Sequence, residues 1–327
     1  MSRIQQTLCV DFGSANIRMF LSPRNEIFTE KACVATHVGS KGDPQFMALG
    51  ETALNMIGRT PEHIQILNPI QNGDIIDFKS AEIIFKRLMH RVQGRMLWLG
   101  PNVIVCVQKQ PHEIQQRAIR RLCMVSGARK VEFSIRALAI ARAMELNIQD
   151  PHGHLIVDIG HETTDISILS LGKVVYEHRL KIAGKHIALS IVAALKDKYK
   201  MSISLEQAMG VLHEHLQLRI NGSAKPFEVF GRCLDEQLPK TQVITIEELR
   251  QMVVQPIRFI LEAIVQMLSV CTPRLASDIY QSGVILVGGG AQIKGLSYFL
   301  RKKLKLPVFV PDFPERLSVT GAIIKDT

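Results

Sequence analysis

Two short segments of the chain place an aspartate near the end of an apolar stretch and a glycine two residues later. Asp11 and Gly13 form the first pair, and Asp158 and Gly160 form the second. A turn of this kind presents a carboxylate and backbone N–H groups to one point, which suits Mg²⁺ and a polyphosphate. A single Asp-x-Gly is most simply a turn. Two copies with matching flanks predict two similar domains that hold a nucleotide.

A third segment ends an apolar strand in consecutive glycines. Residues 283–287 are predicted to form a buried strand, and Gly288, Gly289, Gly290 and Ala291 follow it before a helix. Glycines near a helix N-terminus let backbone approach a ligand closely, although a purely structural turn has the same composition. Neither G-x-G-x-x-G nor G-x-x-x-x-G-K-[ST] occurs, so the dinucleotide and P-loop interpretations lose their main support.

The elements that must position these residues alternate between strands and helices, which predicts an α/β fold. The segment 218–245, with its scattered Gly and Pro, is predicted to be irregular. Strands are predicted at 7–13, 17–21, 32–37, 102–107, 130–134, 154–160, 174–182, 283–287 and 308–310; helices at 79–92, 113–126, 137–146, 185–198, 204–216, 245–271 and 292–303.

The composition of the chain limits the classes of protein to which it can belong. The 327 residues suffice for about two domains, and 21% charged with 46% apolar residues is typical of an ordered, soluble protein. No stretch is predicted to cross a membrane or to act as a signal peptide, and six dispersed cysteines predict reduced, mostly buried thiols. The net charge of +10 favours an anionic partner, but 6% aromatic residues give stacking-type nucleic-acid binding no support.

Together these segments resemble the actin, sugar-kinase and heat-shock-chaperone ATPase superfamily, and within it the chain is similar to the MreB-like bacterial actins. The resemblance runs nearly from end to end. Further matches lie at 58–61, 73–78, 238–241 and 319–322. The first phosphate loop of the family corresponds to Asp11, Gly13, Ser14, Ala15 and Asn16, the second to Asp158, Gly160, His161, Glu162 and Thr163, and the adenosine loop to Gly288, Gly289, Gly290 and Ala291.

The resemblance implies an actin-like ATPase fold: two similar RNase H-like domains, each with a smaller inserted subdomain, around a nucleotide cleft. Domain I is expected at 1–145 with its subdomain at about 32–73, and domain II at 146–327 with its subdomain at about 184–243. The C-terminal helix, 316–327, is expected to return to domain I. The implied cofactors are ATP and Mg²⁺, with Asp11 and Asp158 holding the metal directly or through water.

Three departures from the family pattern bear on nucleotide use. His161 and Glu162 stand where the family has two glycines, so side chains replace bare backbone and a carboxylate would repel the γ-phosphate. Arg136 stands in the segment where the family writes Ile-Glu-Glu-Pro, so the carboxylate that positions the attacking water is lost. In the helix that holds the ribose and adenine, Glu206 is kept but Met209 replaces a polar anchor. We therefore expect at most slow ATP turnover, with Glu162 as the remaining candidate for a catalytic carboxylate.

Membrane attachment in MreB-like proteins uses an N-terminal amphipathic helix or an apolar loop. Here the only Trp lies in the apolar run Met96, Leu97, Trp98 and Leu99, next to basic residues. Such a loop suits an anionic lipid interface. The alternative is that Trp98 packs under a neighbouring helix.

The first hypothesis is a filament-forming, ATP-binding protein on the cytoplasmic face of the inner membrane, where it organises cell shape and cell-wall synthesis. Its expected partners are further copies of itself and the anionic membrane surface, with membrane proteins of morphogenesis or a second MreB as further candidates; no nucleic acid is expected. The second hypothesis is a degenerate actin-like scaffold that assembles, or modulates a true MreB filament, without nucleotide turnover. A small-molecule kinase of the same superfamily is disfavoured, because no added acceptor-binding domain or catalytic Asp is evident.

Overall fold

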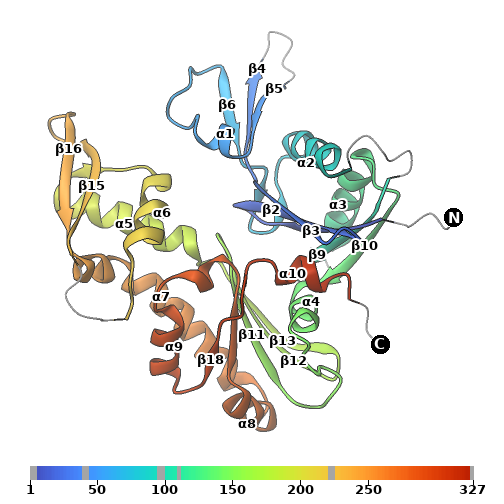
Figure 1. Cartoon of the computed structure of the whole chain (residues 1–327). Helices are drawn as coiled ribbons and strands as arrows, with labels where there is room; N and C mark the ends of the chain where they lie inside the picture. The colour runs from blue at the N-terminus through green and yellow to red at the C-terminus, as the bar shows by residue number, and fades with distance from the viewer. Residues whose placement is uncertain (1–5, 39–43, 94–99, 109–111, 220–224, 325–327) are drawn as a thin grey trace. The chain divides into compact units, whose positions relative to one another are not determined.

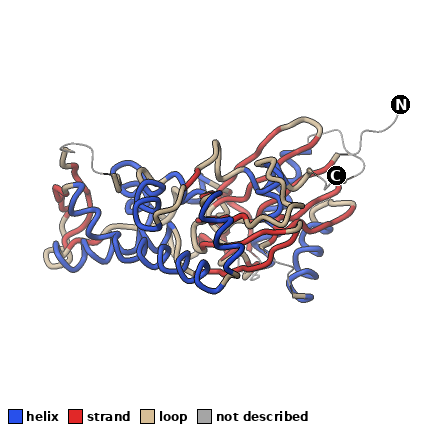
Figure 2. Tube along the Cα trace, turned by 90° about the horizontal axis from the view of Figure 1, so that it is seen from below, coloured by secondary structure: helices blue, strands red, loops and turns tan. Residues whose placement is uncertain are grey.

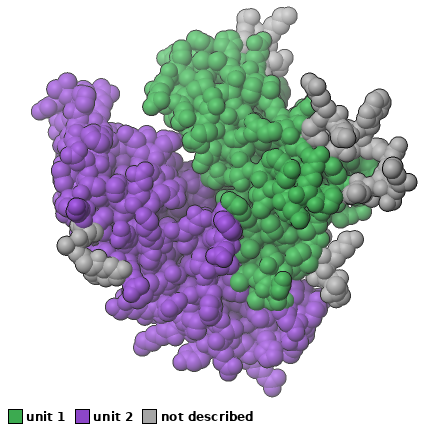
Figure 3. All heavy atoms as spheres, viewed as in Figure 1, with its two compact units in different colours: residues 1–146, 316–327 green, residues 147–315 purple. Residues whose placement is uncertain are grey.

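The computed structural model describes residues 6–38, 44–93, 100–108, 112–219 and 225–324. The chain divides into two compact units, which Figure 3 shows in green and purple. Unit 1 comprises residues 1–146 and 316–327, and unit 2 comprises residues 147–315. Helices and strands occur in both units (Figures 1 and 2), which confirms the predicted α/β class.

Unit 1 is built on a five-stranded sheet with the order β10-β9-β1-β2-β3. Strand β1 pairs antiparallel with β2 and parallel with β9. Helices α2 and α3 pack on one face, and α4 and α10 on the other. The bounds are β1 (Thr7–Phe12), β2 (Asn16–Ser22), β3 (Glu26–Lys31), β9 (Asn102–Val107), β10 (Lys130–Ile135), α2 (Phe78–Gln93), α3 (Glu113–Val125), α4 (Arg136–Ala143) and α10 (Leu317–Gly321).

The alternation of side chains along β1 decides where its aspartate points, because successive residues of a strand face opposite sides of the sheet. Leu8 and Val10 belong to the core under α2 and α3. Cys9 belongs to a second core on the other face, with Ala139 of α4. Asp11 follows Cys9 in this alternation, so its carboxylate lies on the face that α4 and α10 cover.

A smaller sheet with the order β5-β4-β6 follows β3 in the chain. Strand β4 is central and pairs antiparallel with both neighbours. A two-stranded ribbon, β7 with β8, leads from it to α2. The bounds are β4 (Val34–Val38), β5 (Pro44–Leu49), α1 (Glu51–Leu54), β6 (Ile64–Leu67), β7 (Ile70–Gln71) and β8 (Asp74–Ile75).

The main sheet of unit 2 repeats the arrangement of unit 1. Its order is β13-β12-β11-β17-β18, with β11 antiparallel to β12 and parallel to β17. Asp158 stands one residue before the end of β11, as Asp11 does in β1. The predicted pair of similar domains is thus confirmed in the sheet topology. The bounds are β11 (His154–Ile159), β12 (Thr164–Ser170), β13 (Lys173–Leu180), β17 (Val284–Val287), β18 (Val308–Phe309), α5 (Gly184–Tyr199), α6 (Leu205–His215), α7 (Ile246–Val270), α8 (Pro273–Ser282) and α9 (Leu296–Leu304).

The prediction of an irregular segment at 218–245 is wrong for most of its described part. Strands β15 (Phe227–Cys233) and β16 (Pro239–Ile244) form a hairpin there, and β15 also pairs with β14 (Met201–Ser202). The two presumed breakers have structural roles. Pro239 opens the edge strand β16, where a missing N–H is tolerated. Gly231 lies where a Cβ would come within 2.5 Å of the Ser202 carbonyl oxygen.

Helix α7 is long and apolar enough to span a membrane by length and composition, contrary to the expectation that no segment qualifies. Its buried residues Leu249, Val253, Ile257, Ile260 and Ile264 recur at helical spacing and belong to the core of unit 2. The packing therefore explains its composition as that of a core helix.

Candidate functional site

The first loop, between β1 and β2, is held in place by its carbonyl groups. The Asn68 side-chain amide donates to the Ser14 carbonyl, and the Ala32 N–H donates to the Ala15 carbonyl at 3.0 Å. A Cβ on Gly13 would lie 2.6 Å from the Asn16 carbonyl oxygen, so only glycine fits this turn. The close approach gives Gly13 a packing role and fixes the loop next to Asp11.

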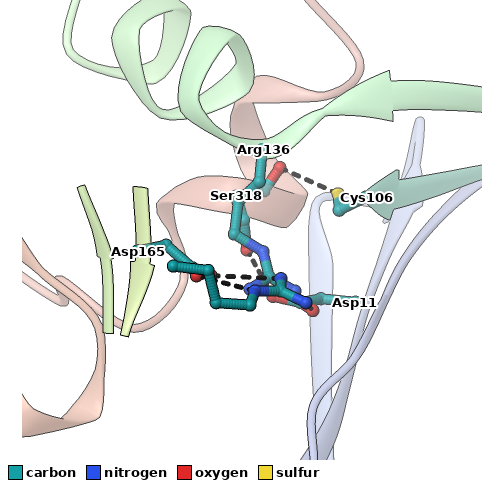
Figure 4. A network of polar contacts seen from close by, with 6 residues as sticks. Asp11, Cys106, Arg136, Asp165 and Ser318 are labelled. Atoms are coloured by element: carbon teal, nitrogen blue, oxygen red, sulfur yellow. Dashed lines mark hydrogen bonds and ion pairs between the residues drawn. The ribbon is translucent and has the colours of Figure 1, made fainter. Parts of the chain in front are cut away.

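Asp11 is engaged at both carboxylate oxygens inside unit 1 (Figure 4). Oδ1 accepts a hydrogen bond from the Arg136 guanidinium at 2.6 Å, and Oδ2 accepts one from the Ser318 hydroxyl at 2.8 Å. Asp11 is only 6% exposed, and the Arg136 side chain is 17% exposed. Arg136 is the first residue of α4, and Ser318 lies in α10, so the two helices that cover this face each supply one partner.

This arrangement does not fit a Mg²⁺ ion coordinated directly by Asp11. A cation would have to compete with a guanidinium that is already hydrogen-bonded to the carboxylate, and two positive groups at one carboxylate repel each other. The family resemblance assigns the metal to Asp11 and Asp158, and the structure shows that the Asp11 carboxylate is already engaged by Arg136 and Ser318.

A buried thiol completes the surroundings of Asp11. Cys106 stands opposite Asp11 in the β1–β9 register and donates its S–H to the Ser318 carbonyl at 3.2 Å. Burial raises the pKa of the Cys106 thiol well above its usual value, and the negative Asp11 carboxylate raises it further. The thiol is therefore neutral and acts as a donor. Helix α10 is fixed here by a close approach to α4, since a Cβ on Gly321 would lie 1.8 Å from the Ala139 carbonyl oxygen.

The second loop, between β11 and β12, is joined to the start of α5. The Gly184 N–H donates to the Gly160 carbonyl at 3.3 Å, and the Lys185 N–H donates to the His161 carbonyl at 2.7 Å. The Gly160 N–H in turn donates to the Thr163 carbonyl at 2.9 Å. Helix N-termini carry N–H groups without a partner in the helix, and two of those in α5 are used to hold this loop.

Glu162 lies inside the second loop and is only 5% exposed. Its carboxylate accepts a hydrogen bond from the Lys185 ammonium at 2.7 Å. The negative charge that the sequence placed in the loop is thus balanced within unit 2 by the chain's own cation. The Lys185 ammonium therefore engages one of the two oxygens of the Glu162 carboxylate.

Lys185 is the partner of Glu162 in the second loop, and sequence reasoning missed it. A buried carboxylate needs a partner, so Glu162 itself was a signal that a basic residue would be near. His186 follows it, and its Nδ1 accepts the Ala183 N–H at 3.3 Å. Burial lowers the pKa of His186, and the neighbouring Lys185 lowers it further against the opposing effect of Glu162. The N-terminus of α5 therefore carries one cation, Lys185, beside a neutral imidazole.

The glycine turn after β17 packs directly against β11. A Cβ on Gly288 would lie 2.3 Å from Asp158 Oδ1, and one on Gly290 would lie 2.3 Å from a methyl carbon of Ile159. A Cβ on Gly289 would meet no atom within 4 Å. The structure therefore brings Asp158 and the turn ending at Ala291 together, and two of the three glycines have a packing reason. Gly289 has no such reason.

The remaining predicted site residues lie on other elements. Glu206 is in the first turn of α6 and is half-buried, and Met209 of the same helix packs against the core of unit 2. The predicted membrane loop, Met96 to Leu99, lies outside the described residues.

Comparisons with known proteins agree on one family. The family model described as MreB/Mbl protein matches residues 5–326. The chain is 30% identical over 307 residues to the cell shape-determining protein Mbl of Bacillus subtilis, covering 93% of this chain and 91% of that protein. It is also 30% identical over 309 residues to the cell shape-determining protein MreB of Escherichia coli, covering 94% of this chain and 89% of that protein.

Solved structures give the same result. MreB 5 of Spiroplasma citri bound to AMPPNP superposes with a TM-score of 0.90 at 26% identity, covering 98% of this chain and 95% of that one. The MamK double helical filament, at 18% identity and a TM-score of 0.77, shows the same actin-like fold. From the repeated sheets, the two loops and these matches, we conclude that the chain belongs to the MreB/Mbl family of actin-like proteins.

Proposed function

We propose that this chain is a filament-forming cytoskeletal protein of the MreB kind that binds ATP and hydrolyses it slowly or not at all. The observation that carries nucleotide binding is the repeated geometry. Asp11 and Asp158 stand at equivalent places of two sheets with the same strand order, and the glycine turn packs against Asp158. The MreB 5 structures with AMPPNP and with ADP support this proposal.

Within unit 1, the residues proposed for phosphate contact are Gly13, Ser14, Ala15 and Asn16. In unit 2 they are Gly160, His161 and Thr163, with Gly288 to Ala291 and Glu206 on the adenosine side. Loop glycines that pack tightly against backbone hold such a cradle in shape before the ligand arrives. Mg²⁺ as a cofactor is proposed at Asp158 alone.

Slow turnover follows from the two charged residues that depart from the family pattern. The family's water-positioning carboxylate is absent beside Arg136, and Glu162 is held by Lys185. Loss of such a group typically lowers the rate by about 10²- to 10⁴-fold. ATP would then control filament assembly by binding, without being hydrolysed quickly.

Filament formation is proposed from family membership and from the MamK filament, whose fold this chain shares. A head-to-tail contact that does not close by rotation propagates into a filament. We place the filament at the cytoplasmic face of the inner membrane, where its role would be in cell shape and cell-wall synthesis. The net charge of +10 supports an anionic membrane as a partner.

A second candidate function is a scaffold that assembles, or modulates a separate MreB filament, without nucleotide. The observation that favours it is that both oxygens of the Asp11 carboxylate already accept hydrogen bonds from the chain itself, one from Arg136 and one from Ser318. The two candidates differ in one measurable property, because only the first requires nucleotide binding.

The test is the melting temperature of the purified chain with Mg²⁺ and increasing ATP, ADP and AMPPNP. Ligand at 100 times its Kd stabilises the native state by roughly 2.7 kcal/mol, or about 5 to 10 °C for a unit of this size. Asp158→Asn should reduce the shift, whereas Asp197→Asn, an exposed aspartate on α5, should not. Pelleting and electron microscopy with and without ATP then separate a nucleotide-gated filament from a static one. Absence of any shift at millimolar ATP would favour the scaffold.

A further inference from the structure

We propose that the outer face of the β15–β16 hairpin in unit 2 is a self-association surface, on which two copies of this chain pack about a two-fold axis. The hairpin forms most of the small sheet β14-β15-β16 (Figure 1). This contact needs no nucleotide, and its two-fold symmetry makes it a different contact from the head-to-tail one proposed for the filament.

The two faces of the hairpin differ in burial, because successive residues of a strand point to opposite sides of the sheet. The inner face belongs to the core of unit 2 through Phe227, Val229 and Ile244. Phe230 is 61% exposed on the outer face, and Val243, its diagonal neighbour on β16, is 53% exposed. The exposed residues of the outer face are Glu228, Phe230, Arg232, Pro239, Thr241 and Val243. An apolar centre with a charged rim is typical of an interaction surface.

Opposite charges flank Phe230 along β15. Glu228 precedes it by two residues and Arg232 follows it by two, so the three side chains share the outer face. Four residues of a strand span about 13 Å, which is too far for Glu228 and Arg232 to pair with each other. In the described part of the chain no salt bridge joins either of them to another residue, and Arg232 Nε donates to the Gln237 carbonyl at 3.2 Å. Both charges can therefore meet partners from outside the chain.

A second copy of the same hairpin supplies both partners at once. Two sheets can pack face to face with their strands nearly aligned. If a two-fold axis passes between two hairpins at Phe230, perpendicular to the strands, β15 of one copy lies antiparallel over β15 of the other. Phe230 then meets Phe230, and Glu228 of each copy meets Arg232 of the other. Such reciprocal contacts define an isologous interface.

Strand β16 fits the same arrangement. Val243 stands opposite Glu228 in the hairpin register and Pro239 stands opposite Arg232, so the axis would bring Val243 of one copy over Pro239 of the other. Thr241 would lie near its own equivalent. Lys240 is the one charged residue of β16, and its Nζ donates to the Tyr199 carbonyl at 2.5 Å on the inner side. No pair of like charges on the two strands is therefore brought together.

The experiment measures self-association of the full chain without nucleotide by analytical ultracentrifugation. We expect a dimer for the unmodified chain. Glu228→Arg places a guanidinium opposite Arg232 of the other copy, and Arg232→Glu places a carboxylate opposite Glu228. Each like-charge pair occurs twice in the dimer, so each variant should raise the Kd by roughly tenfold or more. The two variants change the net charge in opposite directions, so an effect of net charge cannot explain a loss in both.

The two-fold arrangement predicts a specific rescue. A mixture of Glu228→Arg and Arg232→Glu restores opposite charges at both places, and so does the double variant that carries both changes in one chain. Both should associate with about the Kd of the unmodified chain. Asp197→Arg is the matched control, because it makes the same charge change at an exposed aspartate of α5 and should leave the Kd unchanged.

A crosslinking measurement gives the same answer whether or not filaments form. Thr241→Cys should be joined to itself by a short bismaleimide, because the two-fold axis brings Thr241 of both copies together. Cys233 is half-buried and the other five cysteines are buried, so the unmodified chain is the reference for background. Adding Glu228→Arg to Thr241→Cys should lower the yield of crosslinked dimer by roughly tenfold.

Loss of the dimer in both single variants, with recovery in their mixture, is the expected result. A dimer that survives both charge reversals, or a chain that is monomeric by sedimentation and does not crosslink through Thr241→Cys, would overturn the proposed surface. Loss without recovery in the mixture would overturn the two-fold arrangement, since a head-to-tail contact through the hairpin has no reciprocal partners. ATP binding is measured separately, so its failure would leave this contact untouched.

Discussion

Replacing Arg136 with methionine should be among the most destabilising single changes in unit 1. Methionine fills much of the same volume but leaves Asp11, 6% exposed, without its cationic partner. Breaking one side of a buried ion pair typically costs about 3–5 kcal/mol. The Ser318 hydroxyl still donates to Oδ2 at 2.8 Å, which places the expected loss at the lower end, about 3 kcal/mol.

The assay is thermal unfolding followed by circular dichroism and calorimetry, in which the two units can melt separately. A loss of about 3 kcal/mol corresponds to roughly 6 to 12 °C for a unit of this size. The double variant Asp11→Asn with Arg136→Met removes the uncompensated charge, and we expect it to recover at least half of the loss. Arg117→Met, which removes an exposed arginine, should melt within about 1 to 2 °C of the unmodified chain.

Two results would refute this reasoning. Arg136→Met could melt together with the unmodified chain, which would mean that the ion pair contributes nothing to stability. Alternatively, the double variant could be as unstable as the single one, which would assign the loss to side-chain packing rather than to the stranded Asp11 charge.

Three further predictions concern the glycines and the start of α5. Gly289→Ala should leave the melting temperature nearly unchanged, because a Cβ there meets no atom within 4 Å, but it should weaken ATP binding if ligand approaches this backbone; equal affinity by titration would contradict that contact. Gly321→Ala should lower the free energy of unfolding by roughly 1–3 kcal/mol, because the new Cβ would lie 1.8 Å from the Ala139 carbonyl oxygen and force α10 away from α4. Urea unfolding measures this loss, and an unchanged urea midpoint would count against this packing. The pKa of His186 is lowered by burial and by Lys185, so the unfolded chain binds the proton more readily than the folded one. The free energy of unfolding that this pKa difference contributes is fully present above the unfolded pKa of about 6.5 and is lost as the pH falls through the folded pKa. His186→Gln should therefore reduce the decline in the free energy of unfolding of unit 2 between pH 7 and 5, as measured by urea unfolding.

The sequence was sufficient to predict the repeated strand pattern of the two main sheets. Strands β1 and β11 are both apolar runs that end in Asp-x-Gly, and local patterns of this kind depend only on neighbouring residues. The same holds for helix α2, predicted at 79–92 and found at Phe78–Gln93. The family assignment, which rested on the order of such motifs along the chain, is confirmed.

The hairpin of β15 and β16 escaped prediction because its Gly and Pro were interpreted as breakers. Pro239 stands at the start of an edge strand, and Gly231 is required by the neighbouring Ser202 carbonyl. The explanation for Gly231 depends on its neighbour β14, which is more than twenty residues away in the chain, and the explanation for Pro239 depends on β16 lying at the edge of the sheet. Pairing across such distances is not visible in a local pattern.

The partners of the site residues were out of reach for the same reason. Ser318 is separated from Asp11 by 307 positions, and Arg136 is separated from it by 125. Lys185 is 23 positions from Glu162. The sequence showed that Arg136 and Glu162 depart from the family pattern, but only the tertiary structure shows that each is paired with an opposite charge.

These ion pairs change the interpretation of the two residues that depart from the family pattern. Without Arg136 and Lys185, the carboxylates of Asp11 and Glu162 would be buried without a compensating charge. Each would then cost several kcal/mol in a unit whose total stability is of the order of 10 kcal/mol. Buried ion pairs are also often no more stable than apolar side chains of similar size, so stability alone does not explain why both pairs are kept. Arg136 and Lys185 each leave part of the side chain exposed beside a phosphate-type loop. An anionic ligand that meets these cations would account for both observations, and the melting temperature measured with increasing ATP distinguishes this explanation from a purely structural one.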